Sequence, residues 1–491
     1  MKFFLSAAWR TYSLSAYLLI CMYTHAQAQV TFESSNVRLD SAFAWAKMKA
    51  LSFAHDGGDP VGYWYEAALP QREAFCMRDV SHQAIGAALL RLNQHNLNMF
   101  KKFAENISAE KDYCSYWEIN RYNQPAPIDY ENDSDFWYNL PANFDVVYNA
   151  WRLYQWTGDK NYLQHTAFQK FYALSMDNYV DHWHLGNDQV MQRTRQLHSS
   201  NAQRFGANRG IPTYNEGGRG ETKLGIDLTA ALIAAYRAYA EILKLNGEPE
   251  KATTYRNKAN REKKFLNEFW WDKAKQEYRS VQYTDQSFDY FMVGKDQAFL
   301  HYLLYFDVIE NPSYVSQLME QYRKNYPQLI VELKSYLPIL FYENGYSQLA
   351  TQMIIDLCAP TNTRRDYPEN SFTIIEHVTR GLMGVEADVT SNTVTTLSRV
   401  EAGDWAELKM FPVFSNTVSV KHRGTNATTF TSESGGTLTW RAGMPGHHNY
   451  LFVNGVKQKC DSGIDHGRPY ALIDVAVKPG ETMQVSVNPS E

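Results

Sequence analysis

Apolar residues recur at three- and four-residue spacing through most of residues 39–383, which is the pattern of amphipathic helices. The clearest stripe covers 227–245 and stops at an Asn-Gly pair, a typical helix end. A second covers 145–156, and a Thr-Gly-Asp turn separates it from a helical pattern over 162–179. The same spacing predicts further helices at 40–53, 80–92, 97–107, 252–269, 294–306, 313–325, 333–342, 347–357 and 372–383. Paired helices with short turns predict a closed array of helical hairpins.

The pattern changes after Gly384, where apolar and polar residues alternate between Gly, Asn and Pro turns. This alternation predicts strands at 406–410, 418–422, 437–440, 450–455 and 483–487. We therefore expect a mainly α protein, with a helical domain over 29–385 and a small C-terminal β-sandwich over 386–491.

The first 28 residues have the form of a secretion signal. Lys2 and Arg10 lie before an apolar run at 14–22, and Ala-Gln-Ala at 26–28 gives the small-x-small cleavage pattern. The run is shorter than the roughly 20 residues that span a bilayer, and the bulky residue before Cys21 fits a lipid-modification signal poorly. We expect an exported protein, periplasmic or extracellular, that is not held in a membrane after cleavage.

The composition is that of a globular protein, with 44% hydrophobic and 21% charged residues among 491. A net charge of −5 provides no basic field for nucleic acid, so we expect no such partner. Aromatic residues reach 14%, and Tyr and Trp suit half-wet surfaces such as sugar-binding clefts. A carbohydrate is therefore the partner that we expect, whereas the composition does not indicate an oligomeric state.

Metal and cofactor chemistry has little support in the sequence. Cys76, Cys114, Cys358 and Cys460 form no CxxC pair, and we expect buried thiols or at most one disulfide. The motifs of metalloproteases, serine hydrolases and nucleotide-binding proteins are absent, so we expect no cofactor and no metal. Alternating acids around Asp133 resemble a calcium loop but lack the Gly and the distal Glu of an EF-hand.

Three long polar connections, 56–79, 111–143 and 184–227, are candidates for functional loops at one end of the helical array. Cleavage of a glycosidic bond needs two carboxyl groups that face each other across a pocket. Acids occur among aromatic residues in four clusters, at 64–79, 116–138, 214–221 and 364–370.

Several of these features together resemble a known superfamily. They are Arg78-Asp79 before a helix, the glycine-rich acidic loop before Asp227-Leu228-Thr229-Ala230, Phe269-Trp270-Trp271-Asp272 at a helix end, and the terminal β-sandwich. This arrangement is similar to the six-hairpin (α/α)6-barrel glycosidases, which include trehalases, glucoamylases, processing α-glucosidases and α-L-rhamnosidases. The resemblance implies an (α/α)6 barrel and a glycoside hydrolase that removes a terminal sugar, typically with inversion.

The resemblance also implies roles for individual residues. The general acid would be Glu216 or Glu221, and the general base Glu369, with Glu376 as a nearby rival that we also count as substrate-binding. Arg78 and Asp79 match a pair that binds sugar hydroxyls. The remaining substrate-binding candidates are Trp64, Trp117, Glu118, Asp129, Trp137 and Arg219. Each acid also has a plainer explanation, as a solvated loop charge or as a first-turn partner of a helix N-terminus.

Two other functions stay open at this stage. A polysaccharide lyase would use Tyr or His as base and Arg to neutralise a uronate, drawing on His82, His184, His198, Tyr214 and the arginines Arg193, Arg195, Arg204 and Arg209. We favour the other explanation of those arginines, as salt-bridging struts for the acidic loops, because buried loop acids nearby need partners. A secreted carbohydrate-binding protein without catalysis is the other alternative.

Overall fold

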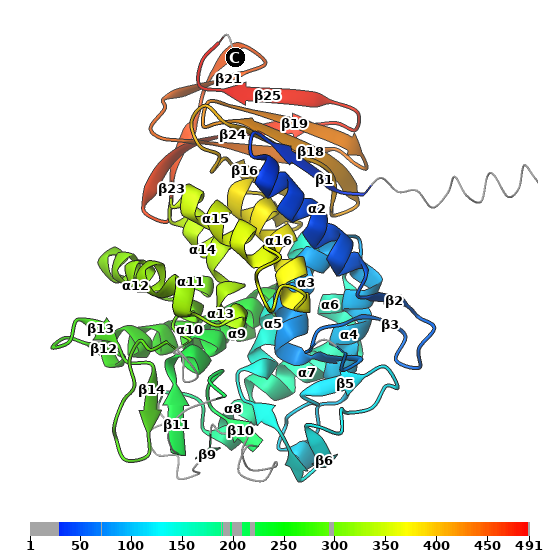
Figure 1. The fold of residues 1–491 in the computed structure, drawn as a ribbon, viewed down its shortest axis with the longest axis vertical. Helices are drawn as coiled ribbons and strands as arrows, with labels where there is room; N and C mark the ends of the chain where they lie inside the picture. The colour runs from blue at the N-terminus through cyan, green and yellow to red at the C-terminus, as the bar shows by residue number, and fades with distance from the viewer. Residues whose placement is uncertain are drawn as a thin grey trace, which may run out of the picture.

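The computed structural model describes residues 29–69, 71–187, 189, 197–198, 209–216, 221–293 and 299–489. Its helices lie before residue 383 and its long strands after residue 385, so a helical domain precedes a domain of β-sheet (Figure 1). The longer helices are α2 (Val37–Leu51), α3 (Met77–Leu89), α4 (Asn93–Glu105), α5 (Ala142–Thr157), α7 (Thr166–Met176), α9 (Ile226–Leu245), α10 (Pro249–Phe269), α12 (Pro312–Asn325), α15 (Ser347–Cys358) and α16 (Pro368–Glu376). The shorter ones are α6 (Asn161–Gln164), α8 (Asn178–Trp183), α11 (His301–Tyr305), α13 (Val331–Lys334) and α14 (Leu337–Glu343).

The helix predicted over 162–179 is divided into α6, α7 and α8. His165 causes the first break, because its backbone is extended and its ring nitrogen accepts a hydrogen bond from the amide of Ala167, so that it caps α7. A side chain that competes locally for backbone amides begins a new helix here despite the continuous apolar stripe.

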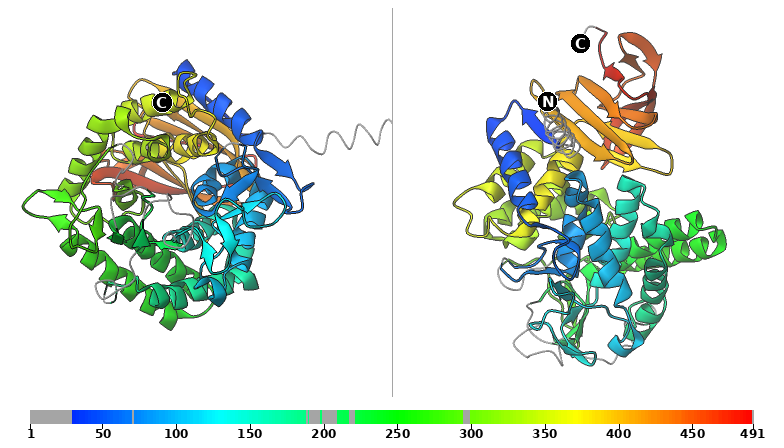
Figure 2. Two further views of the ribbon diagram at one scale, coloured as in Figure 1. Left: turned by 60° about the horizontal axis from the view of Figure 1, so that its bottom comes forward. Right: turned by 90° about the vertical axis from the view of Figure 1, so that its right-hand side faces the viewer.

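The helical domain contains an inner ring of helices. Contacts run from α3 to α5, α9, α11 and α14, then through the π-helical turn η5 (His377–Leu382) to α16, which returns to α3. The left view of Figure 2 shows helices arranged around a central axis. Inner α9 is buried on nearly every side, whereas its neighbour α10 buries one stripe, as expected for an outer helix.

Two helices of the ring approach each other unusually closely at Gly86 in α3. A Cβ atom added at Gly86 would lie 2.0 Å from the carbonyl oxygen of Phe372 in α16. Only glycine therefore allows α3 and α16 to touch at this point, and this contact closes the ring.

The sheet domain consists of two sheets that pack face to face. Their strand orders are β1-β17-β18-β19-β25-β21-β22 and β15-β16-β20-β24-β23. Phe430 of one sheet stacks on Trp440 of the other, with ring centroids 5.2 Å apart. The strands are β15 (Glu386–Asp388), β16 (Thr393–Leu397), β17 (Trp405–Val413), β18 (Asn416–Arg423), β19 (Ala427–Ser434), β20 (Leu438–Pro445), β21 (Tyr450–Val453), β22 (Val456–Lys459), β23 (Asp461–Asp465), β24 (Arg468–Val477) and β25 (Thr482–Ser486).

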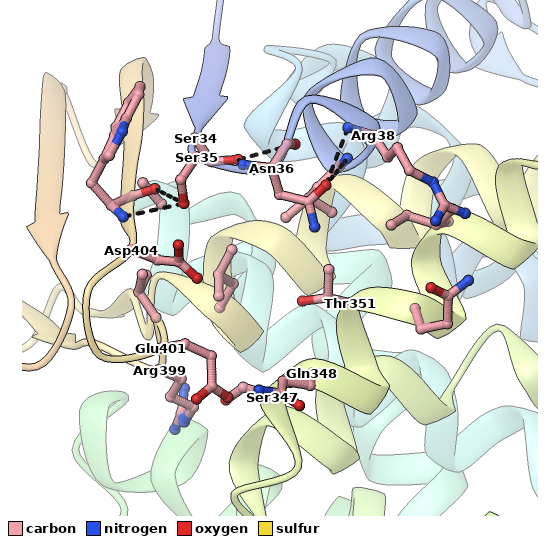
Figure 3. A pocket seen from close by; sticks show the side chains of 17 residues that line it. Ser34, Ser35, Asn36, Arg38, Ser347, Gln348, Thr351, Arg399, Glu401 and Asp404 are labelled. Carbon is pink, nitrogen blue, oxygen red and sulfur yellow. Dashed lines mark hydrogen bonds between the residues drawn. The ribbon is translucent and has the colours of Figure 1, made fainter.

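The edge of the first sheet comes from the beginning of the described chain. Strand β1 (Thr31–Ser34) pairs antiparallel with β17, a contact that the sequence pattern did not predict. Asn36 then starts α2 by accepting hydrogen bonds from the amides of Arg38 and Leu39. Figure 3 shows this junction, where a cavity of about 190 Å³ lies between α2, α15 and the loop that carries Glu401 and Asp404.

Short strands occupy the long connections between helices. Figure 1 shows several of them, among them β5, β6, β10, β11 and β14, at the end of the helical domain opposite the sheets. They are β2 (Ala54–Asp56), β3 (Tyr63–Tyr65), β4 (Ala74–Cys76), β5 (Glu118–Asn120), β6 (Tyr130–Asn132), β7 (Asp135–Phe136), β8 (Tyr138–Asn139), β9 (Leu197–His198), β10 (Arg209–Ile211), β11 (Glu221–Gly225), β12 (Trp271–Asp272), β13 (Glu277–Tyr278) and β14 (Val281–Tyr283). The cysteines at 76, 114, 358 and 460 are not joined in disulfides within the described part of the chain. In the same part of the chain, no helix is long and apolar enough to cross a membrane.

Candidate active site

A cavity of about 180 Å³ brings three of the predicted site residues together. Arg78 from the start of α3, Glu216 from the segment after β10 and Glu369 from the start of α16 all line it. The other lining residues are Tyr214, Asn215, Phe299, Tyr302, Ile330, Glu332 and Tyr336. Segments far apart in the sequence thus meet at a pocket that is rich in carboxylates and rings.

Four inner helices carry an acid in their first turn: Asp79 in α3, Asp145 in α5, Asp227 in α9 and Glu369 in α16. A helix N-terminus favours negative charge. All four side chains are nevertheless buried, and burial raises the pKa of Asp79 to about 6, of Asp145 to about 8 and of Asp227 to about 6. Desolvation therefore outweighs the helix dipole at this end of the ring.

Glu369 has the environment of a proton donor. Burial raises the pKa of Glu369 well above its usual value, and the charge of Asp79 adds to this, while Arg78 opposes it. Its Oε2 atom has no hydrogen-bond partner among the described residues. A carboxyl group that is protonated, lines a cavity and has an unpartnered oxygen is suited to general acid catalysis.

Glu216 has the opposite environment. Its carboxylate lies 3.2 Å from the guanidinium of Arg78, and 39% of its side chain is exposed. Arg78 also lies 4.0 Å from Asp79 and over the ring of Trp117, 5.6 Å from the centroid. Glu216 is therefore paired with a guanidinium, and its partly exposed oxygen atoms can contact water.

Two of the first-turn acids hold the segment that carries Glu216. Asp227 accepts hydrogen bonds from the hydroxyl of Thr213 and the amide of Tyr214, at 2.7 and 2.8 Å. Asp145 accepts a hydrogen bond from the Tyr214 hydroxyl. The positions of α5 and α9 therefore fix where Glu216 enters the cavity.

Aromatic side chains form one wall of the cavity. Tyr214 stacks on Tyr302 with centroids 4.1 Å apart, and the Tyr302 hydroxyl donates to that of Tyr336 over 3.0 Å. His82 stacks on the far side of Tyr336 at 3.4 Å. Rings with polar edges offer both stacking and hydrogen-bonding groups to a sugar.

Two predicted substrate-binding residues lie away from the cavity, and these predictions are corrected. Trp64 is fully buried, stacks on His55 and donates its ring N–H to Asp59, so it is a core residue. Glu376 lies at the opposite end of α16, where Arg152 and Arg380 donate to it. One helix cannot present both ends to one pocket, so Glu376 is no rival to Glu369.

Four other predicted residues lie behind the cavity without lining it. Glu118 accepts hydrogen bonds from Arg72 at 2.7 Å and from the thiol of Cys76 at 3.0 Å. Burial, reinforced by the charge of Glu118, raises the pKa of Asp129 to about 8. Trp117 and Trp137 are each 6% exposed, and the amide of Trp137 donates to the carbonyl of Asp129. Of these four residues, Trp117 contacts Arg78, whose guanidinium lies over its ring.

Some predictions fall on residues that the structure does not describe. Arg219, Arg193, Arg195 and Arg204 lie outside the described residues, as do the side chains of Glu221, His198 and Arg209. Of the other lyase candidates, His82 is buried behind Tyr336, and His184 is exposed at the end of α8. Tyr214 lines the cavity, but its hydroxyl is bound to Asp145.

The sequence analysis missed Glu332, Tyr302 and Tyr336. Glu332 lies in the single turn α13 and pairs with Arg364 at 2.7 Å. The available signal was its position immediately before the helix predicted at 333–342, just as Asp79 immediately precedes the helix predicted at 80–92.

Comparisons with known proteins match the fold and not the sequence. No family model and no curated protein matches the chain. Among solved structures, an α-L-rhamnosidase from Dictyoglumus thermophilum has a TM-score of 0.58 at 13% identity, over 94% of this chain and 50% of that one. A GH78 family rhamnosidase from Bacillus sp. GL1 has a TM-score of 0.58 at 11% identity, over 82% of this chain and 42% of that one.

A third match is a putative kojibiose phosphorylase from the human microbiome, with a TM-score of 0.54 at 10% identity, over 94% of this chain and 69% of that one. The predicted resemblance to the six-hairpin glycosidases is confirmed for the fold. At these identities the likeness concerns the fold, and this chain spans half or less of the two rhamnosidase chains.

Proposed function

We propose that this protein is an exported glycoside hydrolase that removes a terminal sugar from an oligosaccharide. In this proposal residues 1–28 are cleaved on export, residues 29–385 apart from strand β1 form an (α/α)6 barrel, and residues 386–491 together with β1 form the β-sandwich. The confirmed likeness in fold to the six-hairpin glycosidases supports a carbohydrate-active enzyme.

One observation carries the proposal: of the three carboxyl groups that line the same small cavity, Glu369 and Glu216 lie in contrasting environments. Glu369 is buried with an unpartnered oxygen among the described residues, and Glu216 is paired with Arg78. Hydrolysis of a glycosidic bond requires one protonated and one ionised carboxyl group on opposite sides of the scissile bond.

These environments favour roles opposite to those expected from the sequence. Glu369, held protonated by burial, would donate its proton to the glycosidic oxygen as the bond to the anomeric carbon breaks. Glu216 would accept a proton from the water molecule that attacks the anomeric carbon from the other face. The water hydroxyl replaces the leaving group, and the configuration inverts.

The test is turnover in carboxylate-to-amide variants. We expect Glu369→Gln and Glu216→Gln each to lower kcat by about 10²–10⁴-fold, because each removes one partner of the proton transfer. Glu250→Gln, at an exposed site on outer helix α10, is the matched control. Circular dichroism and thermal unfolding establish that the variants fold, and NMR of the first sugar released establishes inversion.

The alternatives give different results in the same experiment. Wild-type-like turnover of Glu369→Gln would remove Glu369 from the mechanism. A product that absorbs through a new unsaturated bond would indicate a lyase. Saccharide binding without turnover in the wild-type protein would indicate a carbohydrate-binding protein.

A further inference from the structure

A second and larger cavity adjoins the candidate active site. Its volume is about 540 Å³, compared with about 180 Å³, and the two cavities share Ile330 and Glu332 as lining residues. We call it the outer groove; its remaining lining residues are Tyr326, Pro327, Leu329, Val331, Lys334, Asp356, Leu357, Ala359, Thr361, Asn362, Thr363 and Arg364. Ligand pockets typically measure about 300–1,000 Å³, so the outer groove has the size of a binding site.

We propose that the outer groove binds the leaving-group portion of a neutral oligosaccharide whose terminal sugar occupies the active-site cavity. This inference rests on the proposed function and extends it to a substrate class: chains of three or more sugar units, cut one unit from the end. The shared wall at Ile330 and Glu332 places the scissile bond where the cavities meet.

The charges of the outer groove favour a neutral chain over an anionic one. Lys334 and Arg364 are matched by Glu332 and Asp356, so the lining carries no excess of cations that would attract uronates. Arg364 pairs with Glu332 at 2.7 Å, and the side chains are 41% and 23% exposed. Both therefore have polar atoms available to sugar hydroxyls.

Apolar surface accompanies these polar groups. Leu329, Ile330 and Leu357 line the outer groove, and Lys334 lies over the ring of Tyr326 at 4.9 Å. Sugar rings present hydroxyl edges and C–H faces, so a lining of both kinds fits them better than it fits a purely apolar segment.

The wall of the outer groove is joined to the catalytic carboxyl group through short contacts. Arg364 lies over the ring of Tyr367 at 4.8 Å, and the Tyr367 hydroxyl donates to Asp79 over 3.0 Å. Asn370 in α16 donates to the backbone carbonyl of Arg364 over 2.9 Å. A chain held in the outer groove is therefore positioned relative to Glu369, which α16 also carries.

The first experiment fills the outer groove and leaves the active-site cavity intact. Thr363 is exposed and lines only the outer groove of the two cavities, so Thr363→Trp should obstruct it without disturbing the core. Thr253→Trp, at an exposed position on α10, is the matched control. The substrates are the 4-nitrophenyl glycoside, disaccharide and trisaccharide of whichever terminal sugar the enzyme releases.

We expect kcat/KM of the wild-type enzyme to rise at least about tenfold from disaccharide to trisaccharide, mainly through a lower KM. Thr363→Trp should abolish this gain and retain hydrolysis of the 4-nitrophenyl glycoside, whereas Thr253→Trp should behave as wild type. Equal kcat/KM for both chain lengths, or retention of the gain in Thr363→Trp, would overturn the inference.

A binding experiment separates this inference from the proposed function. The Glu369→Gln variant, with and without Thr363→Trp, is applied to an array of neutral oligosaccharides of graded length. Binding that strengthens with length and is lost with Thr363→Trp supports the groove, even if the wild-type protein hydrolyses nothing and the proposed function fails. Binding that Thr363→Trp leaves unchanged, or binding to none of the saccharides, overturns the groove.

Discussion

Replacement of Asp145 by Asn should change how the stability of the protein depends on pH. Burial raises the pKa of the Asp145 carboxyl group from 3.8 to about 8. Between these values the folded protein holds a proton that the unfolded chain has released, so the free energy of unfolding falls as pH rises. Each pH unit in this window costs about 1.4 kcal/mol, which gives about 4 kcal/mol between pH 5 and pH 8.

Asn keeps the oxygen that accepts the hydrogen bond from Tyr214 and cannot ionise. At pH 5 we therefore expect Asp145→Asn to unfold at the same denaturant concentration as wild type or at a lower one. Between pH 5 and pH 8 its free energy of unfolding should rise relative to that of wild type by up to about 4 kcal/mol. Asp79 and Asp227 titrate in the same window, and because their charges also raise the pKa of Asp145, the difference between the two proteins includes this coupling.

Urea unfolding followed by circular dichroism at pH 5, 6, 7 and 8 measures this difference. Asp181→Asn, on the exposed side of α8, is the control that should follow wild type at every pH. Parallel curves for Asp145→Asn and wild type would refute the argument that burial, rather than the N-terminus of α5, determines the protonation of this carboxyl group.

Three further predictions concern other parts of the ring. Gly86→Ala should lower stability by about 1–3 kcal/mol or more, because its Cβ would contact the Phe372 carbonyl at 2.0 Å; an unchanged melting temperature would contradict this close approach. Arg152→Met should lower the free energy of unfolding by up to about 3–5 kcal/mol, because buried Glu376 loses one of its two arginine partners. The double variant with Glu376→Gln should recover part of that stability in thermal unfolding. In Asp79→Asn the alkaline limb of the pH–rate profile should move to lower pH, because the charge of Asp79 raises the pKa of Glu369; an unmoved limb would exclude that coupling.

The periodic pattern predicted helices well in segments where apolar residues are dense. Helix α9 was predicted at 227–245 and is found at Ile226–Leu245, because its apolar residues leave no other structure that buries them. Glu369, Glu216 and Arg78 were predicted as site residues from acids and arginine among aromatic residues and from the family resemblance, and the structure brings all three to one cavity.

The pattern could not predict which way a side chain faces or which distant strands pair. Trp64 belongs to the same aromatic cluster as Arg78, yet it lies in strand β3 with its ring in the core, and nothing local distinguishes the inner face from the outer one. Strand β1 pairs with β17, which lies more than 370 positions away in the sequence. A strand of four residues has too short a pattern to predict such a distant partner. Glu332 was missed because it lies in a single helical turn outside the four clusters of acids among aromatic residues.

The positions of the first-turn acids explain why a site forms at this end of the ring. A helix N-terminus stabilises a nearby carboxylate by about 0.3–1 kcal/mol, and by at most about 2 kcal/mol in favourable geometry. Burial raises the pKa of Asp145 to about 8, which corresponds to several kcal/mol in the opposite direction. Carboxyl groups are therefore found together at this end of the ring because they occupy the first turns of inner helices. Burial then favours the protonated form of these acids.

Glu216 differs from these acids because it enters from a connection and keeps both solvent and a guanidinium partner. Of the carboxyl groups that line the cavity, Glu369 belongs to the buried helix-borne set and Glu216 does not. A buried carboxyl group with a raised pKa and a carboxyl group paired with Arg78 thus line one pocket, because the first comes from an inner helix and the second from a connection. The same reasoning places the proton donor of the proposed reaction on α16 rather than on the glycine-rich loop.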